Sequence, residues 1–137
     1  MASVAQCRVD LAARADVISG LKCYDKIPET IDPPSFVVGP LDSMTYNLTA
    51  GPTGAIWVFL CRLYAARADS WEAQILLDSF VAPTGASSIK AALEVEATSN
   101  TSSSHWTNVR EARGFAVYSF GGVDYLGCEF VVEMAAA

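Results

Sequence analysis

The chain has 137 residues, of which 52% are hydrophobic, and its formal net charge is −6. Its longest strongly apolar run, Ala55–Cys61, is far shorter than the ~20 residues that cross a bilayer, so the sequence excludes a membrane-spanning helix. Residues 69–137 hold only three basic side chains against nine acidic ones, which excludes an extended phosphate-binding surface there.

This length predicts one domain over residues 1–137. The apolar content is high for a small soluble domain, because surface residues normally dilute the core. We therefore expect part of the apolar surface to be buried against other subunits, with a well-filled monomer as the alternative. Arg8, Asp10 and Arg14 interrupt any apolar stretch near the N-terminus, so we expect no signal peptide and a reducing cytoplasm.

The expected elements begin with an amphipathic helix over residues 3–19, where apolar residues recur every three or four positions. A short strand over 21–26 follows. The stretch 25–54 holds five of the six prolines, which predicts extended, turn-rich chain. Within it we expect a short apolar run over 36–39 and, from alternating polarity, a strand over 43–49 with one dry face.

A strand over 55–65 should pair with the preceding one as a hairpin, and its apolar residues predict burial on both faces. Asp69 and Glu72 have the spacing of a capping box, which predicts a helix that Pro83 ends. The apolar stripe expected to face the core of this helix comprises Trp71, Ile75, Leu76, Phe80 and Val81.

A second helix is expected over 88–95, followed by a polar loop over 98–104. Strands over 106–113 and 115–120 lead through a glycine pair to a last strand over 123–134. The order of the elements predicts an α+β fold, in which the N-terminal helix and the central helix pair pack on a mostly antiparallel or mixed sheet. One face of the last strand should carry Leu126, Cys128, Phe130 and Val132, and the other Tyr125, Glu129, Val131 and Glu133.

Side chains able to carry catalysis are scarce. His105 is the only histidine, so no histidine-based metal site can be built. Glu129 and Glu133 lie about 13 Å apart in a strand, too far to act on one bond. Glu94 and Glu96 are expected to be solvated residues at a helix end. We therefore expect no enzyme, no cofactor and no metal. The cysteines lack metal-binding spacing and are expected to be buried thiols: Cys7, Cys23, Cys61 and Cys128.

Several residues are candidates for contacts with other subunits or partners. The hairpin tip and the loop over 98–104 are expected to become ordered only on assembly, because they are polar, short of charge and lie between well-patterned elements. The three tryptophans, Trp57, Trp71 and Trp106, are expected to anchor the core or an interface. For the arginines that flank Glu111, we expect a salt-bridged or subunit-contact role rather than DNA contact. The candidate contact residues are Ala50, Gly51, Pro52, Thr53, Gly54, Trp57, Phe59, Arg110 and Arg113.

Three segments carry a family resemblance. They are residues 27–40, with Pro-Pro-Ser-Phe-Val-Val; residues 77–85 leading to 88–93; and residues 118–130, with Tyr-Ser-Phe-Gly-Gly-Val-Asp-Tyr. Together with the order of the elements, they resemble tail terminator proteins of long-tailed, siphovirus-type phages of actinobacteria. The likeness covers nearly the whole chain, and its motifs encode packing and turns rather than chemistry.

The resemblance implies a small α+β subunit that forms a ring of six copies. Such a ring caps the tail tube, ends its polymerisation and joins the tail to the head. The implied partners are the tail tube protein, a head-completion or stopper protein, and double-stranded DNA that passes through the lumen without specific binding. No membrane is implied as a partner. The implied location is the virion, at the head–tail junction, after assembly in the host cytoplasm. The family carries no catalytic motif.

Acidic groups on the bore of such a ring would keep the duplex from sticking. The candidates for these groups are Glu129 and Glu133 on the last strand, or Glu94 and Glu96. Two alternatives remain open. One is another ring at the head–tail junction, such as a stopper or adaptor. The other, from a different class, is a small-molecule-binding α+β domain, which needs a concave apolar pocket.

Overall fold

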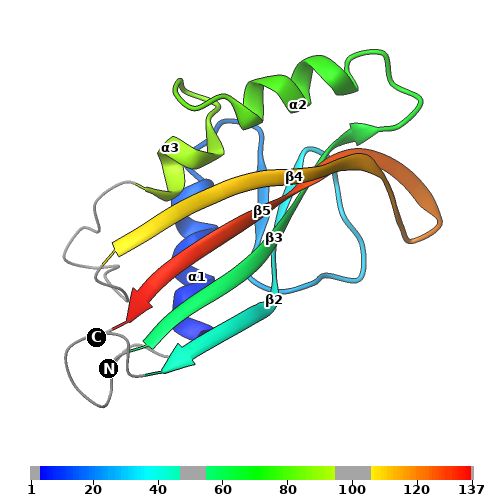
Figure 1. The fold of residues 1–137 in the computed structure, drawn as a ribbon. Helices are drawn as coiled ribbons and strands as arrows, with labels where there is room; N and C mark the ends of the chain where they lie inside the picture. Colours follow the sequence, from blue (N-terminus) through cyan, green and yellow to red (C-terminus); the bar gives the residue numbers. More distant parts are fainter. Residues whose placement is uncertain (1–3, 47–54, 95–105, 137) are drawn as a thin grey trace.

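The computed structural model describes residues 4–46, 55–94 and 106–136. The fold is α+β, as predicted: a five-stranded mixed sheet with three helices on one face (Figure 1). Within the described chain the elements are α1 (Val4–Ala15), β1 (Lys22–Tyr24), β2 (Ser35–Tyr46), β3 (Ala55–Arg67), α2 (Ala73–Val81), α3 (Ile89–Leu93), β4 (Trp106–Phe120) and β5 (Val123–Ala136).

The strands lie in the order β1-β2-β3-β5-β4. Strand β1 runs parallel to β2, and the other neighbours are antiparallel. The predicted hairpins β2–β3 and β4–β5 both form, and Gly121 and Gly122 turn the second one with φ of 60° and 81°, which glycine adopts without strain. Because β5 inserts between β3 and β4, β3 lies at the centre of the sheet.

Strand β2 is continuous, whereas the sequence predicted an apolar run over 36–39 and a separate strand over 43–49. The pairing of β2 with β3 shifts register between Val38 and Leu41 and again before Ser43. Pro40, which has no N–H to donate, lies inside the first shift, where the regular ladder is interrupted in any case. The bulges therefore allow a single continuous strand to include a proline.

Helix α2 begins four residues later than predicted. The side chain of Asp69 lies 3.7 Å from Arg67, in an ion pair beyond the end of β3, instead of capping the helix. Glu72 occupies the N-cap position without a side-chain cap hydrogen bond. The capping box inferred from the spacing of these two acids is therefore wrong, because Asp69 lies before the N-cap position, which Glu72 occupies.

The inward face of α2 also differs from the predicted stripe. Ala73, Leu77 and Phe80 are buried, at the spacing of one helix face. Trp71 is 81% exposed and Ile75 is 58% exposed. Trp71 precedes the helix, in the turn that follows β3, and Ile75 lies on the face of α2 away from Ala73, Leu77 and Phe80, so neither joins the core.

One hydrophobic core lies between the helices and the sheet. Alternate residues of β3 point into it, among them Phe59 and Leu63, both fully buried. The rings of Phe36 and Phe130 meet there edge to face, with centroids 6.2 Å apart. The helices contribute Cys7, Leu11 and Ala15 from α1, Leu77 and Phe80 from α2, and Ile89, Ala92 and Leu93 from α3.

Polar side chains join the helices to one another and to β4. Arg14 of α1 donates to the Leu93 carbonyl (3.1 Å) and to the Thr107 hydroxyl (2.8 Å). Glu94, at the end of α3, is paired with Lys90 and accepts a hydrogen bond from the Val109 backbone N–H (2.8 Å). The expectation that Glu94 is simply solvated is therefore wrong. Burial opposes its charge, but these two hydrogen bonds lower the pKa of Glu94 below its ordinary value.

Candidate interaction surface

The face of the sheet opposite the helices, called the open face below, carries the clearest candidate site. No helix of the described chain packs on it, and in Figure 1 it faces the viewer while the helices lie behind. Strand β3 presents Val58, Leu60, Arg62 and Tyr64 to this face, since successive side chains of a strand point to opposite sides. On this face the predicted burial of β3 is confirmed at Val58 and Tyr64, whereas Leu60 and Arg62 are only half-buried.

Aromatic rings gather on the open face around Tyr64. Its ring lies 6.5 Å from Tyr118, 5.6 Å from Phe120 and 5.8 Å from Tyr125, centroid to centroid, each in an edge-to-face arrangement. Tyr64 and Tyr125 are buried, and Val37 of β2 packs beside them. Strand β4 shifts register between Arg113 and Ala116, a bulge that bends strands and re-aims their side chains. This cluster gives the open face a small core of its own.

An ion-pair chain crosses three strands beside the rings. Arg62 of β3, Glu129 of β5 and Arg113 of β4 are direct cross-strand neighbours. Glu129 lies 3.1 Å from Arg62 and 3.4 Å from Arg113, so it is shared by both guanidinium groups. Arg110 pairs with Glu133 at 3.1 Å on the same face.

Arg62 links the ion pairs to the rings. Its guanidinium carbon lies 4.3 Å from the centre of the Tyr118 ring, within cation–π distance. Its Nε atom is buried and has no hydrogen-bond partner. Burial disfavours the charge of Arg62, but hydrogen bonds to Tyr64 and Glu129 raise its pKa above the ordinary value. Arg62 therefore stays charged and is held in place on three sides.

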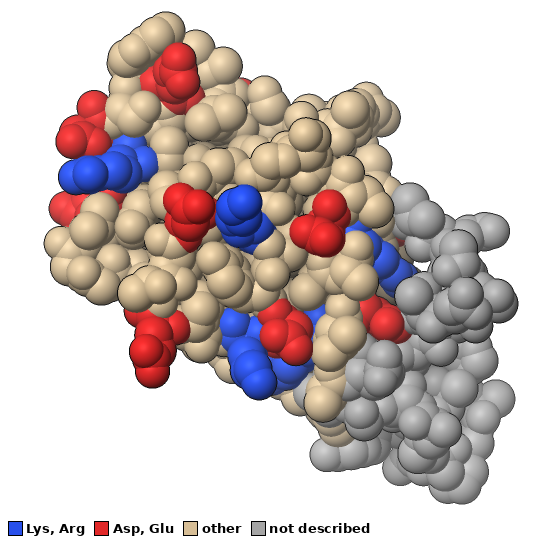
Figure 2. Space-filling view, turned by 180° about the vertical axis from the view of Figure 1, so that it is seen from behind, with Lys and Arg blue, Asp and Glu red and all other residues tan. Residues whose placement is uncertain are grey.

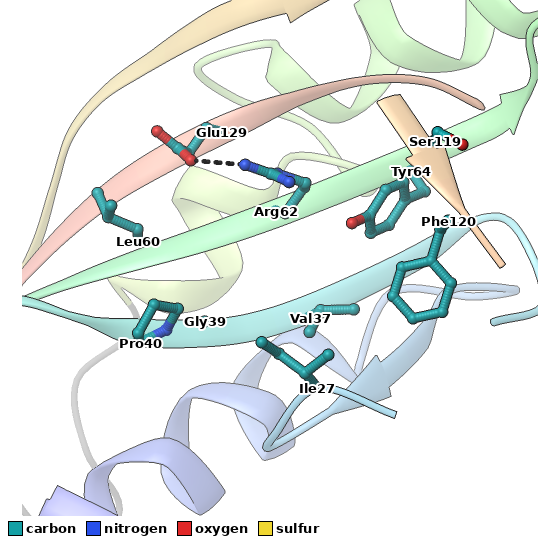
Figure 3. A pocket seen from close by; sticks show the side chains of 10 residues that line it. All are labelled: Ile27, Val37, Gly39, Pro40, Leu60, Arg62, Tyr64, Ser119, Phe120 and Glu129. Atoms are coloured by element: carbon teal, nitrogen blue, oxygen red, sulfur yellow. Dashed lines mark hydrogen bonds and ion pairs between the residues drawn. The ribbon is translucent and has the colours of Figure 1, made fainter. Parts of the chain in front are cut away.

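The open face is hollowed in front of Arg62 (Figure 3). The volume of this open-face hollow is about 400 Å³. Its walls come from β2, β3, β5, the end of β4 and the segment that follows β1. The residues that line it are Ile27, Val37, Gly39, Pro40, Leu60, Arg62, Tyr64, Ser119, Phe120 and Glu129.

The predicted contact residues of β3 are buried in the chain's own core. Trp57 is 6% exposed and Phe59 is fully buried, because both point toward the helices rather than the open face. Their assignment as partner contacts is therefore corrected: the strand alternation that places Arg62 outside places them inside. The indole N–H of Trp57 has no hydrogen-bond partner there.

The predicted hairpin tip, Ala50, Gly51, Pro52, Thr53 and Gly54, lies outside the described residues, as do the loop over 98–104 and His105. Arg110 and Arg113 were predicted to be salt-bridged or to contact a subunit. Both are salt-bridged, Arg110 to Glu133 and Arg113 to Glu129 and Glu111, and a subunit contact stays a prediction. Both acids, Glu129 and Glu133, are on the open face as expected. Each is neutralised by an arginine, however, so neither is a free negative charge.

Charges elsewhere are mixed. On the side seen in Figure 2, opposite to that of Figure 1, acidic and basic side chains are interspersed and neither sign forms a broad patch. Four regions of apolar surface stand out instead, on α1 and the turn after it, after β1, at α2 and on β4. The large exposed apolar residues are Val9, Val17, Ile27, Trp71, Ile75, Phe115 and Val117.

No disulfide joins the cysteines of the described residues. Three of them are buried as expected (Cys7, Cys61 and Cys128), whereas Cys23 is only half-buried. Burial raises the pKa of Cys61 and of Cys128 to about 12, and the same effect acts on the half-buried Cys23. Among residues 4–46, 55–94 and 106–136, no three potential metal ligands cluster. None of the helices described there is long and apolar enough to span a membrane.

Sequence reasoning missed the hollow and the ring cluster. Tyr118, Phe120 and Tyr125 follow an alternating pattern across the glycine turn, which was a usable signal for one aromatic face.

A search of protein-family models finds no match to the chain, and no curated protein matches it with significant similarity.

Proposed function

We propose that this chain is a non-catalytic structural subunit of a phage tail, which assembles with five further copies into a ring. The ring caps the tail tube, ends its growth and joins the tail to the head. Its partners are then the tube protein, a head-completion protein and the DNA that passes through the lumen. The resemblance of three sequence segments to tail terminator proteins supplies this identity, and the shape of the surface supports it.

The observation that carries the proposal is the exposure of large apolar side chains on several surfaces. Trp71, in the turn after β3, is 81% exposed, and Val117 on β4 is 54% exposed. Strand β4 adds a second feature, because it is an edge strand with one sheet neighbour and has no charged residue from Gly114 to Phe120. Edge strands of monomers are usually protected by charge, so an uncharged one favours pairing or contact with another chain.

The test is to image the purified protein alone and together with tail tubes. A closed ring of one symmetry, found free or on the tube end, supports the proposal. A protein that stays monomeric and does not bind tube ends contradicts it. The partner bound on the side away from the tube distinguishes a terminator from a stopper or adaptor, the closest alternative.

The open-face hollow favours a second candidate function, binding of a small molecule. Its volume of about 400 Å³ falls within the range of ligand pockets, and its walls are mostly apolar with one charged pair. A ligand that raises the melting temperature of a monomer, and loses this effect in Leu60→Trp, would support this candidate. The candidate fails if no compound in a fragment library does so.

A further inference from the structure

The most exposed large apolar residue of the described chain is Trp71. It stands in the turn between β3 and α2, and Ile75 extends the apolar surface by one helical turn. Tryptophan dominates the energetics of protein interfaces when its ring enters a desolvated pocket. Within its own chain, Trp71 has no such pocket, since it remains 81% exposed.

The open-face hollow has the walls that an indole ring requires. Leu60 offers aliphatic surface and Phe120 an aromatic ring for edge-to-face contact, and both are half-buried, while Val37 and Tyr64 beside them are buried. Figure 3 shows Arg62 among these side chains, with its guanidinium paired to Glu129. Trp71 is not among the residues that line this hollow.

The charges beside the two features are complementary. Glu72, next to Trp71, is exposed. Lys26 is exposed next to Ile27, at the hollow's rim, while Arg62 within the hollow is already paired with Glu129. A contact that seats the indole would bring Glu72 toward Lys26, which favours approach in this orientation over the reverse.

We propose that Trp71 of one copy inserts into the open-face hollow of the next copy. The two surfaces are different, so the contact is head-to-tail, and an open chain of copies keeps one unused tryptophan at one end and one unused hollow at the other until it closes. The inference rests on the proposed assembly and names the residues that build it. A ring is its closed form and a filament its open form.

Two variants separate the halves of the contact. Trp71→Ala removes the inserted ring and leaves the hollow intact. Leu60→Trp fills the hollow from a half-buried strand position that favours aromatic residues, and it leaves Trp71 in place. Each variant alone should lose self-association by at least about 30-fold, the size of a hot-spot loss. Circular dichroism and melting temperature establish that both variants fold.

Mixing the two variants gives the decisive result. Trp71 of the filled variant can enter the free hollow of the Trp71→Ala variant, but neither free end of that pair can grow. Sedimentation velocity should therefore show a 1:1 complex and nothing larger. The matched control, Val17→Ala, removes an equally exposed apolar residue from another surface and should assemble as the unmodified protein does.

The outcomes distinguish this contact from the proposed ring. Open filaments of the unmodified protein, with a 1:1 complex in the mixture, would support the contact and contradict the ring. A ring that persists in Trp71→Ala would overturn the contact and leave the ring standing. No complex in the mixture, or an equal loss in Val17→Ala, also overturns the contact.

Discussion

Arg62 of β3 and Glu129 of β5 face each other in directly paired positions of the sheet, 3.1 Å apart, on the side that no helix of the described chain covers. The pair connects two features of the open face. Glu129 continues to Arg113 on β4, and Arg62 lies over the ring of Tyr118. A charge on the central strand is thus tied to β5, through Glu129 to β4, and to the aromatic cluster.

Replacing Glu129 by Gln should destabilise the subunit, because it leaves Arg62 and Arg113 close together without the shared carboxylate. These groups are partly exposed, so we expect the free energy of unfolding to fall by about 1–2 kcal/mol. Glu133→Gln is the matched control, since it breaks one pair with the more exposed Arg110 and should cost under about 1 kcal/mol. Urea unfolding measures both, and equal losses would contradict the shared role of Glu129.

The tie between α3 and β4 predicts a dependence of stability on pH. Hydrogen bonds from Lys90 and the Val109 backbone lower the pKa of Glu94 in the folded chain. Its contribution is therefore fully present above the ordinary carboxyl pKa and is lost as the pH falls through the lower folded value. The difference in unfolding free energy between the unmodified protein and Glu94→Gln should shrink from pH 7 toward acid.

A matched control for this pH effect is Glu111→Gln, which alters an exposed carboxylate on β4. Its unfolding free energy should follow that of the unmodified protein more closely at every pH. A constant difference for Glu94→Gln across the whole range would contradict the structural account of this carboxylate.

The corrected position of Phe59 makes a third prediction. Phe59→Ala removes a fully buried ring from the core and should cost about 3–5 kcal/mol. Phe115→Ala changes an exposed ring at 53% and should shift the free energy of unfolding by about 0.5 kcal/mol or less. Thermal unfolding of dilute protein measures the change in free energy for both variants. A small change for Phe59→Ala would contradict the burial of Phe59 in the core.

The cysteine thiols should resist alkylation in the folded subunit. Burial raises the pKa of Cys61 and Cys128 to about 12, so at pH 8 the reactive thiolate is scarce as well as inaccessible. Mass spectrometry after iodoacetamide treatment should find these two unmodified until urea is added. Cys23, which is half-buried, should react before them. Rapid modification of Cys61 in the absence of urea would contradict the burial of its thiol in the core.

The fold class, the faces of β5 and the β4–β5 turn were predictable from the sequence. Alternating polarity placed Glu129 and Glu133 on the strand face away from Cys128, and the glycine pair marked the β4–β5 turn. The insertion of β5 between β3 and β4 is a long-range pairing that no local pattern encodes. For that reason the partners of Arg110 and Arg113 could not be read from their own neighbourhood.

The hollow and the exposed tryptophan escaped prediction for two physical reasons. The walls of the hollow, such as Ile27, Leu60 and Phe120, come from distant parts of the chain and meet only after the sheet forms. Trp71 was assigned to the core because the Asp69 spacing placed the helix start too early. The chain instead turns after β3, with backbone hydrogen bonds from Ser70 to Arg67 and from Ala73 to Ser70, before α2 begins, and a spacing rule does not register such a turn.

The central claim is that copies of this chain join into a closed ring at the end of a tail tube. The most direct measurement is single-particle imaging of the protein mixed with polymerising tube protein. The account predicts a six-fold ring on the end of each finished tube and tubes of limited length. Tubes that grow unchanged beside a monomeric protein would contradict it.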